Sequence, residues 1–566
     1  MSKPSQRKFA IGVDYGTNSV RAIIVDLADG TEIASAVDHY PSGEAGILLD
    51  RKQPLLARQN PVDYINGFYR AVSKAVKLAA KSGCEFNPAC VVGIGIDTTG
   101  STPIPVDENG MPLAMQPKFA QVNAAQAWLW KDHTAFAEAA KITEKAAKNK
   151  TSYLSKCGGT YSSEWFWSKI LHCKHENPAV FEAAYSWVEL ADFIPAFITG
   201  NTKPERLARS ICAAGHKAMY NAQWDGLPSK AFLKSLDPGL ASVRDRFAPE
   251  AKTSDQVAGY LTEAVAAKTG LAPGIPVAVG AFDAHMGAVG AGIKPGTLVK
   301  IIGTSTCDMM VHPLDETLED IPGVCGIVPG SILPNMYGIE AGQSAVGDIF
   351  NWFVKQLAPA QYTGKGDAHV NLEHEAAKLM PGESGLLALD WNNGNRTVLV
   401  DQLLTGAIVG TTLHTTAAET YRALLEGTAF GALTIINRFE EYGVAVKEVV
   451  NCGGIAEKSP LTMQIYADVC NRPMKISRSA QTCALGAAIF GAVAGDAYKT
   501  VAAAQRKMTG VKPTVYKPNP AAVAVYKKLY ALYRSMHDAY GVKGNRENLY
   551  HVMKDLIAIR ESVRAS

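Results

Sequence analysis

Three aspartates stand where the sequence pattern predicts apolar, ordered surroundings. Asp14 follows the apolar run FAIGV, Asp97 follows VVGIGI, and Asp283 interrupts the small-residue run GAFDAHMGAVGAG. A carboxylate in such surroundings is costly unless it is paired or has a function. Asp283 is therefore a candidate general base that accepts a proton from a substrate hydroxyl group, a task that phosphoryl transfer requires. A capping or turn-forming aspartate is the alternative interpretation.

Two short turns rich in glycine and hydroxyl side chains each separate a pair of apolar runs. The first turn contains Gly16, Thr17, Asn18 and Ser19, and the second contains Gly303, Thr304, Ser305 and Thr306. The backbone N–H groups of such a turn can cradle a phosphate. One isolated turn is explained more simply as a plain hairpin, but two copies can clamp the phosphates of a nucleotide from both sides. Because Asp14 directly precedes the first turn, it is a candidate to hold Mg²⁺ through water.

A third glycine turn is a candidate site for a flat ring such as adenine. It contains Gly453, Gly454 and Ile455 in the segment GGIAEKSP, where Ser459 and Pro460 are helix start signals. Paired glycines permit close approach of a ring, although glycine turns are common. The P-loop pattern G-x-x-x-x-G-K-[ST] is absent, and GIGIDTTG does not fit the dinucleotide-binding pattern. A nucleotide site here would be neither a P-loop nor a Rossmann site.

Strands and helices must alternate to position these turns. The sequence predicts a strand-turn-strand over about 8–26, a helix over about 60–83 that closes at Gly83, and a buried strand over 90–97. This order is typical of an α/β protein with a mainly parallel sheet. The strand-turn-strand pattern repeats near 299–311. We interpret the repeat as a duplication, with domains at 1–290 and 291–566.

Composition excludes several classes of protein. A chain of 566 residues exceeds a single core, and a net charge of +3 gives no reason to expect a nucleic-acid partner. The apolar runs are short or interrupted, and the polar start MSKPSQRKF does not resemble a signal peptide, so no membrane partner is expected. Ten scattered cysteines fit reduced thiols. We expect a cytoplasmic protein; a helical tail over about 519–566 leaves open whether it forms a homodimer.

Taken together and in this order, the motifs resemble those of the FGGY family of carbohydrate kinases, within the actin-like ATPase superfamily. GVDYGTNSVR looks like its first phosphate motif, IIGTSTCD like its second, and NCGGIAEKS like its adenosine motif. GIDTTGS and CALGAAIFG look like its two connecting segments. The resemblance implies two related actin-like (ribonuclease H-like) domains with ATP and Mg²⁺ in a cleft between them. It also implies that Asp283 is the catalytic base and that Asp14 and Asp283 lie at the metal site.

Further segments, spread over residues 11 to 490, look like the members of the family that act on L-ribulose. In Trp130-Lys131-Asp132-His133-Thr134, a threonine stands where many members have the arginine of W-x-D-x-R, which argues against the branches that act on glycerol and xylulose. Without the resemblance, a surface salt bridge is the simpler role for Lys217 in AGHK and for Glu340 in IEAG. By this likeness the sugar site is lined by Gly100, Trp130, Asp132, Lys217, Asp283 and Glu340.

The implied reaction is transfer of a phosphoryl group from ATP to the C5 hydroxyl of a 2-ketopentose, L-ribulose first, in L-arabinose catabolism. The near alternative is a kinase for another pentulose or polyol, such as D-ribulose. The remote alternative is a non-metabolic actin-like ATPase. A chaperone of that class should carry a separate peptide-binding domain, and too little chain remains after about residue 500.

Overall fold

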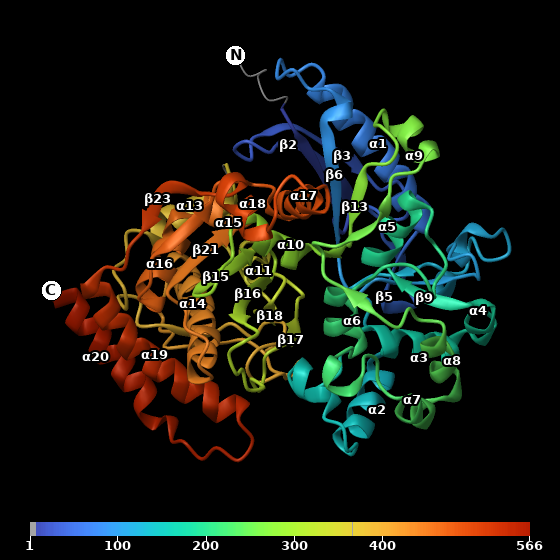
Figure 1. Cartoon of the computed structure of the whole chain (residues 1–566). Helices are drawn as coiled ribbons and strands as arrows, with labels where there is room; N and C mark the ends of the chain where they lie inside the picture. Colours follow the sequence, from blue (N-terminus) through green and yellow to red (C-terminus); the bar gives the residue numbers. More distant parts are fainter. Residues whose placement is uncertain (1–6, 365, 566) are drawn as a thin grey trace.

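Two large sheets form the framework of this computed structural model, which describes residues 7–364 and 366–565 (Figure 1). Within these residues the first seven-stranded sheet has the order β12-β13-β6-β1-β2-β3, with β14 beside β6, and the second has the order β17-β18-β16-β15-β21-β22-β23. The strands of the first sheet are β1 (Phe9–Tyr15), β2 (Ser19–Asp26), β3 (Glu32–His39), β6 (Val91–Thr98), β12 (Val257–Tyr260), β13 (Pro276–Ala278) and β14 (Ala281–Phe282). Those of the second are β15 (Thr297–Ile302), β16 (Thr306–Pro313), β17 (Gly326–Pro329), β18 (Met336–Ala341), β21 (Glu448–Cys452), β22 (Met474–Ser477) and β23 (Val511–Tyr516).

The two sheets share one topology. The strand order β3-β2-β1-β6-β13 in the first sheet matches β18-β16-β15-β21-β22 in the second. In each, the first two strands form an antiparallel hairpin, and the first strand then pairs in parallel with a later strand. The predicted α/β duplication is therefore confirmed, and both phosphate-type turns are hairpin turns at equivalent positions. The prediction of a mainly parallel sheet is wrong, because both sheets are mixed: the hairpin strands and the edge strands β3, β12, β17 and β23 pair antiparallel with their neighbours.

Helix α1 (Pro61–Ala79) forms where the sequence predicts it. The Asn60 side chain accepts a hydrogen bond from Val62 N, and the predicted apolar face is buried, including Tyr64 and Phe68. The predicted end at Gly83 is wrong. The helix stops at Ala79, because the next residues turn back on the last helical carbonyls, and Gly83 takes φ +77° in the following turn.

The aromatic middle of the chain builds a helical layer below the first sheet, in the lower right of Figure 1. Three of its tryptophans, Trp128, Trp167 and Trp187, are fully buried in one core. Its main helices are α2 (Phe136–Ala147), α3 (Phe166–Glu176), α4 (Pro178–Ala183), α5 (Leu190–Thr199), α6 (Ile211–Ala218), α7 (Lys230–Leu236) and α8 (Pro238–Asp245). This layer carries several of the predicted sugar-site residues.

Helix α17 (Thr482–Ala494) belongs to the second half of the sequence but packs on β1 and β6 of the first sheet (Figure 1). The approach is so close that a Cβ atom on Gly12 would lie 1.8 Å from Ala484 O, and one on Gly95 would lie 1.7 Å from Ala487 O. Helix α10 (Asp283–Gly290) packs on α17 as well and also contacts β15 and β16. These two helices join the sheets.

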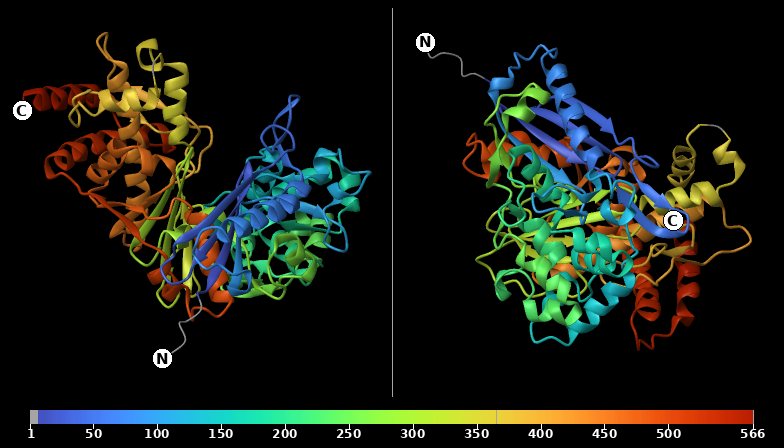
Figure 2. Two further views of the ribbon diagram at one scale, coloured as in Figure 1. Left: turned by 90° about the horizontal axis from the view of Figure 1, so that it is seen from above. Right: turned by 90° about the vertical axis from the view of Figure 1, so that its right-hand side faces the viewer.

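The C-terminal tail forms two helices, α19 (Pro520–Gly541) and α20 (Val552–Ala565), at the red end of the chain in Figure 2. Helix α19 packs on its own half of the molecule, where Tyr533 lies 5.4 Å from the ring of Phe430 in α14 (Ala417–Glu441). No helix among the described residues has both the length and the apolar character needed to cross a membrane. All ten cysteines are free thiols.

Candidate active site

Three carboxyl groups meet at one end of the first sheet. Asp14 and Asp97 occupy paired positions on the parallel strands β1 and β6. Asp283 is the first residue of α10 and directly follows β14, which pairs with β6 at Asp97 and Thr98. The structure thus brings together Asp14 and Asp283, the two aspartates predicted for metal binding and catalysis, and adds Asp97 between their strands.

Burial raises the pKa of each of these carboxyl groups. Asp97 interacts with Asp14 carboxyl to carboxyl, and neither Asp97 oxygen has another hydrogen-bond partner in residues 7–364 and 366–565. Arg21 Nη1 lies 3.5 Å from Asp14 Oδ2 and partly compensates the charge. Burial, and then the negative charge of Asp14, raise the pKa of Asp283 to about 7. A general base works best with a pKa near the operating pH.

The first phosphate-type turn is held from several sides. Gly16 N donates to Ser19 O at 3.0 Å, and Gln59 Nε2 donates to Thr17 O at 2.7 Å. Trp130 Nε1 donates to Thr17 Oγ1 at 3.1 Å, which joins the turn to the predicted sugar-site segment. Asn18 is exposed at the tip.

The second phosphate-type turn is docked on the start of α11 (Gly347–Gln356). Gly303 N donates to Ser305 O at 2.9 Å, which closes the turn. The Thr304 carbonyl accepts hydrogen bonds from the backbone N–H groups of Val346 and Asp348, at 2.8 and 3.1 Å. Gly303 and Thr304 are nevertheless exposed, so a ligand can approach them.

The predicted adenosine turn adjoins the second phosphate-type turn. Gly453 has φ +94°, and a Cβ atom there would lie 2.4 Å from Ile302 O, so glycine is required. A Cβ atom on Gly454 would meet no heavy atom within 4 Å, which shows open space beside it. Ile455 follows, and its Cδ1 lies 2.9 Å from the place where a Cβ atom of Gly347 would be. A ring bound beside Gly454 would therefore share this region with the phosphate turn.

Lys217 and Glu340 form a buried ion pair between the two halves of the chain. Lys217 lies in α6 and Glu340 in β18, and Lys217 Nζ is 3.3 Å from Glu340 Oε2. Burial opposes the lysine's charge, but the Glu340 carboxylate raises the pKa of Lys217 above its ordinary value. The ammonium group also faces the rings of Trp165 and Phe282, at 5.3 and 5.7 Å. Phe282 directly precedes Asp283, so the pair lies next to the candidate base.

Two further sugar-site candidates occupy tightly packed positions. A Cβ atom on Gly100 would lie 2.0 Å from the Phe282 ring, so only glycine fits there. The Asp132 carboxylate is fully buried, forms an ion pair with Arg58, and accepts a hydrogen bond from Ala57 N at 2.7 Å. The contacts of Asp132 among the described residues are thus with its own segment and β5 (Gln53–Gln59), and its role toward a sugar stays a prediction.

Lys169 is a residue that the sequence analysis missed. Its fully buried Nζ donates to the carbonyl oxygens of Ser101, Trp128 and Leu129, at 2.9, 3.2 and 2.9 Å. It therefore ties the segment after Gly100 to the segment before Trp130. Burial lowers the pKa of Lys169 to about 7. The signal was a lysine inside the segment FWSKIL, whose other buried side chains are apolar except for the small Ser168.

His216, His285 and Glu340 are buried side chains of metal-ligand type that come within 4.8 Å of one another. His285 Nε2 lies 3.0 Å from His216 Nε2, a hydrogen-bonding distance between two rings whose pKa values burial lowers. The Glu340 carboxylate already forms an ion pair with the Lys217 ammonium group. We therefore interpret the cluster as a hydrogen-bonded support of Glu340 rather than as a metal centre, since a cation there would face Lys217.

Comparison with known proteins shows the family of this chain. The model for the N-terminal domain of the FGGY family of carbohydrate kinases matches residues 9–290, and the model for its C-terminal domain matches residues 298–495. The chain belongs to the FGGY family of carbohydrate kinases. This FGGY kinase is 43% identical over 548 residues to a ribulokinase of Vibrio parahaemolyticus, an alignment that covers 94% of this chain and 96% of the relative. It is 42% identical over 582 residues to a ribulokinase of Anoxybacillus flavithermus, an alignment that covers 99% of this chain and 100% of the relative.

Solved structures of more distant FGGY-type kinases share the fold. A gluconate kinase from Lactobacillus acidophilus superimposes with a TM-score of 0.78 at 18% identity, covering 95% of this chain and 99% of that one. A Plasmodium falciparum glycerol kinase with ADP gives a TM-score of 0.77 at 16% identity, covering 96% and 100%. The predicted two-domain fold of a carbohydrate kinase is thus confirmed.

Proposed function

We propose that this FGGY kinase transfers the γ-phosphoryl group of ATP to the C5 hydroxyl of ribulose, with L-ribulose preferred. The observation that carries the proposal is the buried Lys217–Glu340 pair beside Asp283. An ammonium group donates hydrogen bonds and a carboxylate accepts them, so the pair offers both partners to a chain of sugar hydroxyls next to a base. Relatives of 40–43% identity that match more than nine-tenths of this chain are ribulokinases, which supports the choice of sugar.

In the proposed reaction, Asp283 accepts the proton of the C5 hydroxyl while the sugar oxygen bonds to the γ-phosphorus and the bond to the ADP oxygen breaks. Donors of the turns at Gly16–Ser19 and Gly303–Thr306 stabilise the charge on the transferring group. The turn at Gly453–Ile455 binds the adenosine part. The sugar part of the site is formed by Lys217, Glu340, Gly100, Trp130 and Asp132, which bind the sugar or shape its pocket.

The residues at the strand ends fit a magnesium ion. Asp14 and Asp97 present carboxyl oxygens to one place, and the oxygens of Asp97 have no hydrogen-bond donor in the described part of the chain. Mg²⁺ prefers such oxygens together with several waters. We propose that Asp14 holds it with help from Asp97 and Asp283. When bound, it would neutralise charge on the phosphate oxygens of ATP.

We further propose a domain division near residue 290 and a cytoplasmic location, the latter supported by ten free thiols.

Release of ADP with Mg-ATP should be measured against L-ribulose, D-ribulose, D- and L-xylulose, ribitol and glycerol. We expect the highest kcat/KM on L-ribulose, and a loss of at least about a thousandfold in kcat for Asp283→Asn with the nucleotide still bound. A maximum on another sugar contradicts the choice of substrate. Near-normal turnover of Asp283→Asn contradicts the choice of base.

A further inference from the structure

A buried polar network surrounds the end of the second phosphate-type turn. Lys300 Nζ lies 2.9 Å from both carboxylate oxygens of Asp308 and 3.3 Å from Thr306 Oγ1. All three residues are at most 1% exposed. A buried ion pair costs desolvation energy, so its hydrogen bonds must be complete for it to be tolerated.

Gln343 connects this network to the rest of the second half. Its backbone N donates to Thr306 Oγ1 at 2.9 Å, and its carbonyl accepts from Thr306 N at 3.1 Å. Its side-chain Oε1 accepts from Lys300 Nζ at 2.9 Å, while Nε2 donates to Asp390 Oδ2 at 2.8 Å. One residue therefore fixes the last residue of the turn and contacts a distant carboxylate.

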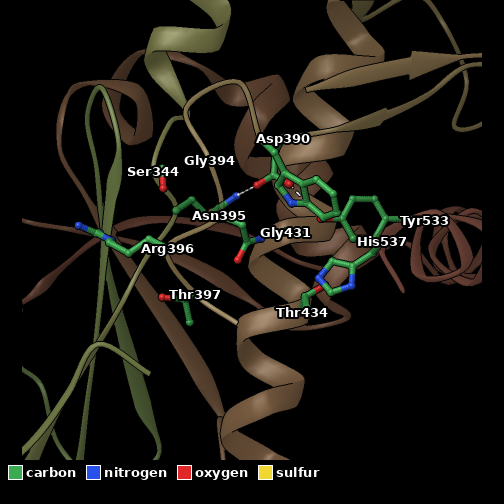
Figure 3. Close-up of a pocket in the computed structure, with 12 residues that line it drawn as sticks. Ser344, Asp390, Gly394, Asn395, Arg396, Thr397, Gly431, Thr434, Tyr533 and His537 are labelled. Atoms are coloured by element: carbon green, nitrogen blue, oxygen red, sulfur yellow. Dashed lines mark hydrogen bonds between the residues drawn. The ribbon is translucent and has the colours of Figure 1, made fainter. Parts of the chain in front are cut away.

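The network ends on the C-terminal helix α19. Tyr533 OH donates to Asp390 Oδ1 at 2.9 Å, and Tyr533 is 1% exposed. Figure 3 shows Tyr533 and His537 beside Asp390, while Arg396 points away from them toward the strands. Helix α19 lies beyond the residues matched by the FGGY C-terminal model, which end at 495. Tyr533 is thus outside the part of the chain that defines the family, whereas Asp390 and Gln343, which link it to the turn, lie inside that part.

Each charged side chain of the network has a partner within it. Lys300 pairs with Asp308, Asp390 accepts from Gln343 and Tyr533, and Arg396 Nη2 donates to the Thr306 carbonyl at 2.5 Å. The cavity beside Gln343, Asp390 and Tyr533 measures about 10 Å³, room for about one water molecule. The site therefore joins structural elements and does not admit a metabolite.

We propose that α19 positions the second phosphate-type turn through Tyr533, Asp390 and Gln343, and that Tyr533 is a positioning residue of the nucleotide site. The inference rests on the proposed binding of ATP phosphates at that turn. Without the tyrosine hydroxyl, Asp390 Oδ1 loses a donor in a buried site, a large penalty that the neighbouring groups relieve by moving. That movement reaches Thr306 through Gln343, and it acts on ATP rather than on the sugar.

The test compares Tyr533→Phe with Tyr530→Phe. Tyr530 stacks on Tyr533 at 6.0 Å, but its hydroxyl bonds Thr434 and Asn437 instead of the network. For Tyr533→Phe we expect the KM for Mg-ATP to rise about five- to tenfold with the KM for ribulose within twofold. The affinity for a non-hydrolysable ATP analogue, measured by calorimetry, should fall by the same factor. Backbone amide hydrogen exchange over residues 299–311 should accelerate. Tyr530→Phe should leave all of these unchanged.

Asp390→Asn provides a second variant if Tyr533→Phe does not fold. An asparagine oxygen can keep the Gln343 bond, while its NH₂ group cannot accept from Tyr533, so the same link is cut from the other side. A variant with a lower melting temperature but unchanged ATP affinity and unchanged exchange over 299–311 overturns the proposal. If no sugar is phosphorylated by the unchanged protein, the proposed function fails, whereas analogue binding and exchange still decide the role of Tyr533.

Discussion

Lys217 and Glu340 meet across the two halves of the chain, with 3.3 Å between Nζ and Oε2 and both side chains less than a tenth exposed. His216 Nδ1 adds a third contact, 3.4 Å from the same carboxylate. Glu340 is therefore held from the first half of the chain although it belongs to the second. A sugar bound at this pair would contact both halves at once, so binding and the approach of the halves are linked.

Glu340→Gln should raise the KM for ribulose about ten- to a hundredfold, since hydrogen bonds to a charged group contribute roughly 1.5–3 kcal/mol. The KM for ATP should change little. Asp320→Asn is the matched control, because it removes a more exposed ion pair, with Lys156, that also joins residues far apart in sequence. Exposed pairs contribute little. Equal changes in both sugar and ATP KM for Glu340→Gln would argue against a sugar contact.

The pH dependence of turnover should follow the ionisation of the Asp283 carboxyl group. Its pKa is raised to about 7, and only the charged form can accept a proton, so kcat/KM should rise as pH increases from 6 to 8 and then level off. Asp283→Asn should remove this rise along with most of the activity. Initial rates at saturating Mg-ATP over this range test the prediction. A profile for the unchanged protein that is flat from pH 6 to 8 would contradict it.

The acid cluster should make stability depend on pH and on Mg²⁺. Folding raises the pKa of Asp14 and Asp97, so the folded protein holds more protons than the unfolded chain once pH exceeds their ordinary pKa of about 4. Their contribution to stability is therefore lost as pH rises from that value through the raised pKa values. Mg²⁺ should raise the melting temperature more at pH 8 than at pH 6.

Asp97→Asn should shrink that difference, since it removes one carboxyl group from the cluster while keeping its shape. Scanning calorimetry with and without Mg²⁺ at both pH values measures it. An equal effect of Mg²⁺ at pH 6 and pH 8 in the unchanged protein would count against the cluster as the magnesium site.

Gly454→Val should block the adenosine site while leaving the fold intact. A side chain at Gly454 would enter open space, so the melting temperature should stay within about a degree, whereas the KM for ATP should rise at least about tenfold. Gly453→Ala is the contrast, because its Cβ atom would collide with Ile302 O and destabilise the protein. Unchanged ATP kinetics in Gly454→Val would place adenosine elsewhere.

Local signals in the sequence were sufficient to predict the hairpins, the existence of α1 and the positions of Asp14 and Asp283. Each depends on a short pattern: an apolar run, a cap or a glycine turn. Lys169 and Tyr533 were not predicted, since their partners lie far away in sequence and helical spacing does not say which distant carbonyl or carboxylate a buried polar tip will reach. Gly83 failed as a helix end because the hydrogen bonds of the last turn, and not the nearest glycine, ended α1.

The glycine positions of the first sheet have a consequence for biosynthesis. The face of β1 and β6 that carries Gly12 and Gly95 is covered by α17, whose last residue follows the end of β6 by nearly 400 residues. At about 5–20 residues per second, a ribosome needs tens of seconds to supply that helix. During this interval the nascent first sheet has one bare face, so the chain completes its folding only after synthesis is nearly finished.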